Sequence, residues 1–148
     1  MKNMLSPHFS LRECEKSDYA IRHGLDNSLP EKFRINAESI AVNILEPVRK
    51  QWGVPFSPSS WYRGDELNKA IGGSSKSQHC TASAVDFEVP GVPNLDVALW
   101  IRDNLDFDQL ILEYYTGGNT GWIHCSRAEN NRYQSLRFNG KQYLQGLI

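Results

Sequence analysis

The sequence predicts one small domain of the α+β class, in which several helices and a short-stranded sheet share a core. The chain has 148 residues, of which 40% are hydrophobic, and this is enough to build one core. One long segment, residues 30–52, repeats its apolar side chains at helical spacing. Three short segments, residues 84–89, 109–113 and 122–126, alternate apolar and polar side chains as strands do. No internal repeat suggests a second domain.

The first helix is predicted near the N-terminus, directly after a capping signal. Ser10 is followed three residues later by Glu13, which is the pattern of a capping box. We expect a short helix to begin there and to continue through Cys14 to about Tyr19.

The main core helix is predicted over residues 30–52, with a stop at Gly53 and a kink at Pro47. Two further helices are expected over residues 65–71 and 94–104. The main helix is recognised by the apolar residues that would form its buried stripe, namely Phe33, Ala37, Ile40, Ala41, Ile44, Leu45 and Val48.

The three predicted strands each place one polar group away from their apolar side. Neighbouring side chains of a strand point to opposite faces. Asp86 therefore lies opposite the valines and phenylalanine of its strand, and Glu113 lies opposite the leucines of the next. His124 shares a face with Trp122, while Cys125 points to the other side and is expected in the core. Asp86, Glu113 and His124 could thus share one concave surface.

Composition and charge exclude several classes of partner. Lys and Arg number 16 against 17 Asp and Glu, so the formal net charge is −1 and no basic region marks a nucleic-acid or anionic membrane surface. No apolar run approaches the ~20 residues of a membrane span, and residues 1–8 lack the apolar run of a secretory signal. Three irregularly spaced cysteines predict no disulfide framework. We expect reduced thiols and no nucleic-acid or membrane partner.

A metal site is one interpretation of the polar residues on these strands. Catalytic zinc is commonly held by three His or carboxylate ligands, with a fourth position left for water. His79, at the end of a glycine- and serine-rich loop, could complete such a set with Asp86 and His124. The spacing is equally compatible with three polar residues that are satisfied by hydrogen bonds.

Several short motifs, in order along most of the chain, resemble the zinc peptidases that cut peptidoglycan stem peptides. That family includes D-alanyl-D-alanine carboxypeptidases and dipeptidases and phage L-alanyl-D-glutamate endolysins. The matching strings are Ser59-Ser60-Trp61-Tyr62-Arg63, Leu67-Asn68, Gly72-Gly73-Ser74, Ser77-Gln78-His79, Ala84-Val85-Asp86-Phe87 and Trp122-Ile123-His124-Cys125-Ser126.

The resemblance implies a hedgehog/D,D-peptidase-like fold, with a mainly antiparallel sheet and helices packed on one side. It also implies that His79, Asp86 and His124 bind Zn²⁺, and that Arg63 lies in the substrate cleft. There a guanidinium can bind a substrate carboxylate or stabilise an oxyanion. Ser77 and Gln78 would line the cleft or orient the first histidine ligand; loop capping is the alternative for both.

The general base is assigned to Glu113 by the same resemblance, with Glu88 as the alternative because it shares the face of Asp86. Many relatives carry an acidic residue three positions before the last histidine ligand, where this chain has Gly121. Another branch carries Glu at the end of the preceding strand, as here. Ala82 replaces a glycine that is common in the turn after the first histidine.

Together these features predict a zinc metallopeptidase that hydrolyses peptidoglycan stem peptides, as an L-Ala-D-Glu endopeptidase or a D,D-carboxypeptidase. We expect residues 1–148 to form one catalytic domain without a separate wall-binding domain, and the protein to be a monomer. The resemblance further suggests a phage endolysin, stored in the host cytoplasm until the membrane is breached. The alternative is a hedgehog-like zinc domain that binds a partner without catalysis.

Overall fold

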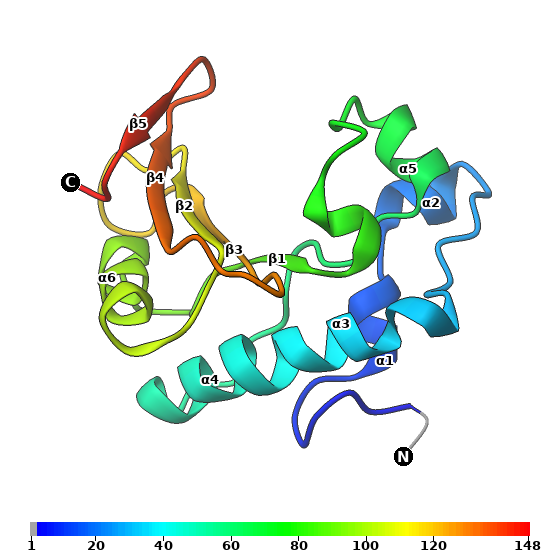
Figure 1. Cartoon of the computed structure of the whole chain (residues 1–148), viewed down its shortest axis with the longest axis horizontal. Coiled ribbons are helices and arrows are strands. Elements are labelled where there is room, and N and C mark those ends of the chain that lie inside the picture. Colours follow the sequence, from blue (N-terminus) through cyan, green and yellow to red (C-terminus); the bar gives the residue numbers. More distant parts are fainter. Residues whose placement is uncertain (1–2) are drawn as a thin grey trace.

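Five strands form one sheet in the order β1-β3-β2-β4-β5 in the computed structural model, which describes residues 3–148 (Figure 1). All neighbouring strands are antiparallel except β2 and β4, which are parallel, so the prediction of a mainly antiparallel sheet is confirmed. The strands are β1 (Ala84–Phe87), β2 (Gln109–Glu113), β3 (Trp122–Ser126), β4 (Gln134–Phe138) and β5 (Tyr143–Gln145).

Most of the helical segments precede β1, and α6 follows it. Within residues 3–148, no helix is long and apolar enough to cross a membrane. The helical segments are α1 (Leu11–Glu15), α2 (Asp18–Arg22), η1 (Glu31–Phe33), α3 (Arg34–Ile40), η2 (Ala41–Leu45), α4 (Glu46–Trp52), α5 (Asp65–Ala70), η3 (Gln78–Thr81) and α6 (Asn94–Asn104).

The N-terminal helix begins where the capping signal predicts but ends earlier. Ser10 and Glu13 form the reciprocal capping box, which confirms the start of α1. The predicted continuation to about Tyr19 is wrong. Ser17 is extended, and its side chain accepts a hydrogen bond from the backbone N–H of Ala20, so it begins a second helix.

The predicted helix over residues 30–52 is confirmed as the consecutive segments η1, α3, η2 and α4. Pro47 lacks a backbone N–H and would crowd the preceding turn of a regular helix. The turn before it is a π-helix, in which the N–H of Glu46 donates to the carbonyl of Ala41. This wider turn accommodates the proline, and the helix ends at Gly53, whose φ of 65° is left-handed.

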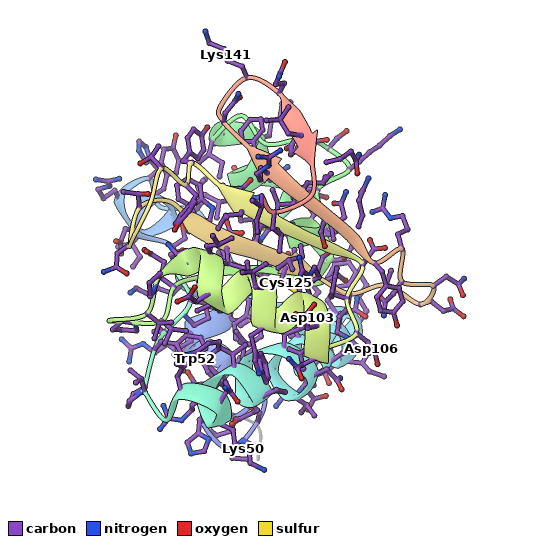
Figure 2. The ribbon with its side chains drawn as sticks, turned by 90° about the vertical axis from the view of Figure 1, so that its left-hand side faces the viewer. Lys50, Trp52, Asp103, Asp106, Cys125 and Lys141 are labelled. Carbon is purple, nitrogen blue, oxygen red and sulfur yellow. The ribbon has the colours of Figure 1, made fainter. Side chains whose placement is uncertain are left out.

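One face of the sheet packs on these helices, and the opposite face carries the polar residues. Val85, Phe87, Leu110, Ile123 and Cys125 are buried in the core with the apolar stripe of the long helix. Figure 2 shows α6 lying across the sheet at Cys125, with Trp52 of α4 nearby. The core position predicted for Cys125 is confirmed, and the other sheet face is left for a site.

Gly53 offers a test of the helix stop. Its φ is 65°, and nothing lies within 4 Å of the position that a Cβ would occupy. Gly53→Ala should therefore lower the free energy of unfolding by about 1 kcal/mol through backbone strain alone. Urea denaturation measures this change, with Gln51→Ala, at an exposed position of α4, as the control. Equal stability of the two variants would contradict the assignment.

Candidate active site

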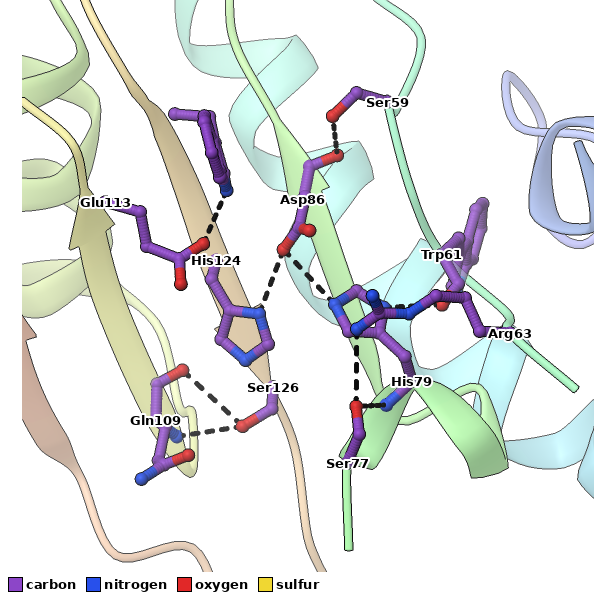
Figure 3. A network of polar contacts seen from close by, with 11 residues as sticks. Ser59, Trp61, Arg63, Ser77, His79, Asp86, Gln109, Glu113, His124 and Ser126 are labelled. Atoms are coloured by element: carbon purple, nitrogen blue, oxygen red, sulfur yellow. Dashed lines mark hydrogen bonds and ion pairs between the residues drawn. The ribbon is translucent and has the colours of Figure 1, made fainter. Parts of the chain in front are cut away.

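His79, Asp86 and His124 converge on one point at the polar face of the sheet (Figure 3). The register of β1 on β3 pairs Asp86 with His124, so their side chains lie next to each other on the same face. One carboxylate oxygen of Asp86, Oδ1, lies 2.9 Å from His124 Nδ1 and 3.3 Å from His79 Nε2. The candidate ligand atoms of the three residues all lie within 4.8 Å of one another.

A backbone segment beside β1 fixes the orientation of the first histidine. The ring Nδ1 of His79 lies 2.6 Å from the carbonyl oxygen of Trp61. Trp61 is held there because the backbone of Ser60, one residue earlier, bridges to Asp86. The hydroxyl of Ser77 accepts a hydrogen bond from the backbone N–H of His79 and caps η3. The Nε2 atom of His79 is thereby directed at Asp86.

The three side chains are better suited to ligating one divalent cation than to satisfying one another by hydrogen bonds. When Nδ1 of His79 donates to the Trp61 carbonyl, the neutral ring presents a lone pair at Nε2. That lone pair faces Asp86 Oδ1, which is itself an acceptor. His79 is only 2% exposed, so a second proton on its ring is costly. Two imidazole nitrogens and a carboxylate are the ligand set of many catalytic zinc sites.

The charges of the trio favour an ionised Asp86. Burial raises the pKa of Asp86, but His79 and His124 outweigh this effect and hold the pKa well below its usual value. Burial lowers the pKa of His79 more than Asp86 raises it. For His124, burial is again the largest single effect, yet the contact with Asp86 leaves its pKa raised. An anionic carboxylate between two imidazoles is suited to a cation.

Glu113 lies on the neighbouring strand, directed at the same space (Figure 3). Its register partner on β3 is Trp122, whose indole N–H donates to Glu113 Oε2. Burial raises the pKa of Glu113, and the negative charge of Asp86 raises it further. A carboxylate with a raised pKa is suited to accept and return a proton near neutral pH.

Gly121 cannot be replaced by an acidic residue in this backbone. Its φ is 68°, and a Cβ atom there would lie 2.0 Å from the carbonyl oxygen of Glu113. The tight approach of this turn to the end of β2 therefore requires glycine. In this chain, Glu113 provides the carboxylate at this end of the cleft.

The cleft in front of the trio has a volume of about 750 Å³ and includes every residue that the sequence placed in the site. Arg63 lines it and donates from Nη2 to Ser77 Oγ, while Arg63 Nε is buried without a hydrogen-bond partner among residues 3–148. Gln78 and Trp122 line it as well. Glu88, the alternative base, is exposed outside the cleft and accepts a hydrogen bond from Asn94.

Ala82 adopts the conformation for which glycine is favoured. It ends η3 with a φ of 59°, directly before the strand that carries Asp86. A left-handed alanine costs about 1 kcal/mol relative to its favoured conformations. The turn is therefore retained despite the alanine, and it leads directly into the strand that carries Asp86.

The sequence analysis missed an ion pair between Asp108 and Arg132, of which Arg132 lines the opposite end of the cleft. Asp108 is 2% exposed and accepts three hydrogen bonds from Arg132 and one from Gln78. The hydrogen bonds from Arg132 lower the pKa of Asp108 to about 2, despite its burial. Asp108 thus holds Gln78 and Arg132 at the cleft. The 24-residue separation between Asp108 and Arg132 leaves no local pattern to reveal the pair.

The three candidate ligands, the half-buried carboxylate of Glu113 and the guanidinium of Arg63 lie in one cleft. This is the composition of a mononuclear metal-dependent hydrolase site. Comparison with protein families agrees with this class. Residues 7–126 match the family model described as Peptidase M15, and the chain belongs to this family of metallopeptidases. A search of the curated proteins found no match. The family match ends with β3, so β4 and β5 lie beyond it.

Removal of one ligand tests the metal centre. His79→Ala should lower zinc affinity by at least about 100-fold, because it leaves two of three protein ligands. Zinc content after dialysis, measured by mass spectrometry, reports the loss. His23→Ala is the control, since His23 is exposed and stacks on Tyr19, outside the cleft. Full zinc retention in His79→Ala would remove this residue from the ligand set.

Asp108 predicts a defined acid dependence of stability. Its pKa is lowered in the folded protein, so its contribution is present above pH 4 and is lost as the pH falls toward about 2. Asp108→Asn should lower the free energy of unfolding by about 1 to 2 kcal/mol at pH 7 and by much less at pH 2. Urea denaturation at both pH values tests this, with exposed Asp96→Asn as the control. A pH-independent loss would contradict the assignment.

Proposed function

We propose that this protein is a zinc peptidase that hydrolyses a peptide bond in the stem peptides of bacterial peptidoglycan. The observation that carries the proposal is the half-buried carboxylate of Glu113 in the same cleft as the three candidate ligands. A metal centre that only held loops together would need no proton acceptor there. Membership of the Peptidase M15 family supports the substrate class.

His79 Nε2, Asp86 Oδ1 and His124 Nδ1 would hold the zinc ion. When bound, zinc would act as a Lewis acid that polarises the scissile carbonyl and lowers the pKa of the attacking water. Glu113 accepts the proton of the attacking water and returns it to the leaving amine. The hydrogen bond from Trp122 keeps Glu113 Oε2 occupied, so Oε1 is the oxygen available for this transfer.

Arg63 would hold the anionic part of the substrate opposite Glu113. Its Nη2 bond to Ser77 fixes one side of the guanidinium, and its backbone N–H donates to the carbonyl of His79. The guanidinium lines the cleft, where it can donate to a substrate carboxylate or to the oxyanion of the attacked carbonyl. Ser77 then positions both Arg63 and the first histidine ligand.

The biological role that we propose is lysis of a bacterial host by a phage endolysin acting as a monomer. The enzyme would be stored in the host cytoplasm and would reach the wall after the membrane is breached. L-Ala-D-Glu endopeptidase and D,D-carboxypeptidase activity are both consistent with the trio. A hedgehog-like, non-catalytic binding domain is the second candidate, which the zinc ligands alone would also fit.

Mass spectrometry of digested peptidoglycan tests the proposal. The zinc-loaded protein should create new stem-peptide termini that identify the bond. Chelation should abolish them, and added zinc should restore them. Intact stem peptides from the main wall chemotypes, with a folded and zinc-loaded protein, would favour the binding domain.

The role of Glu113 is tested by a substitution that keeps its shape. Glu113→Gln retains an oxygen for the Trp122 N–H but cannot accept the proton, so kcat should fall by about 100- to 10,000-fold while zinc binding persists. Glu88→Gln is the matched control and should retain activity. Wild-type rates in Glu113→Gln would exclude Glu113 as the base. A loss of activity confined to Glu88→Gln would assign this role to Glu88.

A further inference from the structure

The two ends of the cleft differ in chemistry along the strand direction. At one end, β2 and β4 begin with Gln109 and Gln134, which are hydrogen bonded to each other, near Arg132. At the other end, the same strands finish with Glu113 and Phe138. His124, paired with Ile111, lies between the two ends. A substrate that lies along the strands therefore contacts different groups on the two sides of the candidate metal centre.

Four aromatic rings form a row beyond Glu113. The ring centroids of Trp122 and Tyr114 lie 5.0 Å apart, those of Tyr114 and Phe138 5.5 Å, and those of Phe138 and Tyr143 4.5 Å. All four residues line the cleft. Tyr114 and Tyr143 are 46% and 57% exposed, so much of the row remains open to a ligand. We call Tyr114, Trp122, Phe138 and Tyr143 the aromatic row.

The backbone fixes the position of the aromatic row at the cost of conformational strain. Tyr114 has a φ of 55°, which is strained for a tyrosine, and its N–H donates to the carbonyl of Phe138. Gly140, in the turn between β4 and β5, leaves room for the Tyr114 ring, because a Cβ there would lie 2.9 Å from it. Phe138 and Tyr143 lie beyond residue 126, so the match to the family does not include them.

The aromatic row and the cationic part of the cleft differ in charge, so they are suited to different ligands. The cations of the cleft are Arg63, Lys76 and Arg132, and none of them belongs to the aromatic row. Glu113 accepts the indole N–H of Trp122, and its negative charge disfavours a carboxylate beside the row. Neutral rings with phenolic hydroxyls suit a ligand that has both apolar C–H faces and hydroxyl groups. A pyranose ring has this combination.

We propose that the aromatic row binds an N-acetylated hexopyranose of the glycan strand, while the acidic stem peptide extends toward the cationic residues. This inference rests on the proposed function, because peptidoglycan joins a neutral glycan to an acidic peptide. Trp122 and His124 are two residues apart on β3, or about 7 Å. The lactyl-L-alanyl link between the sugar and the first peptide carbonyl has about the same extended length. For a sugar at the Trp122 end of the aromatic row, this match in length assigns L-Ala-D-Glu as the scissile bond.

Paired substrates test the inference. The zinc-loaded full chain is given the same stem peptide free and attached to its disaccharide. The attached form should be cleaved with a kcat/KM about tenfold higher, and Tyr143→Ala should remove this advantage through KM. Tyr143→Phe keeps the aromatic ring and should retain most of this advantage. Tyr133→Ala is the control, because Tyr133 is exposed, packs on the ring of Phe107 and lies outside the cleft.

The outcomes distinguish the inference from the proposed function. Equal cleavage of both substrates, or an equal loss on both in Tyr143→Ala, would overturn the sugar site and leave the peptidase intact. Cleavage at D-Ala-D-Ala would overturn the placement of the scissile bond. If neither substrate is cleaved, the proposed function fails, and chitotetraose binding followed by tryptophan fluorescence and NMR still decides the sugar site. Binding that Tyr143→Ala weakens supports it, and no binding overturns it.

Discussion

The pairing of β1 with β3 is the constraint on which the site depends. This register places Asp86 directly opposite His124, and a shift of one residue would turn one of the two side chains into the core. The core face of the same strands prevents such a shift, because Val85, Phe87, Ile123 and Cys125 are buried there. Hydrophobic packing on one face of the sheet thus fixes the geometry of a charged centre on the other.

The segment that contains Trp61 and Arg63 connects the candidate metal centre to the wall of the cleft. Its backbone pairs with Asp86 through Ser60, orients His79 through the Trp61 carbonyl and continues to Arg63. The position of one candidate ligand and that of the guanidinium are therefore set by the same few residues. Displacement of this segment would disturb metal binding and substrate binding together, since both depend on its backbone.

Glu113 distinguishes a catalytic centre from a structural one. Burial raises its pKa, the indole of Trp122 holds one oxygen, and the glycine at position 121 allows the turn to approach the end of β2. A half-buried carboxylate beside an anionic Asp86 is unfavourable for stability alone. Its presence in a cleft with three candidate metal ligands is consistent with a role in proton transfer.

The sequence by itself determined the class of fold, the long helix and the three strands that carry Asp86, Glu113 and His124, because these elements are encoded by local periodicity. It also supplied the members of the candidate metal-binding trio through their order and their motifs. The tertiary structure decided between Glu113 and Glu88 as the carboxylate in the cleft, since alternation places Glu88 on the face of Asp86 and also allows Glu113 to share that surface. It also revealed the Asp108–Arg132 pair and the aromatic row, which join strands distant in the chain. Such contacts depend on strand pairing and have no local signature.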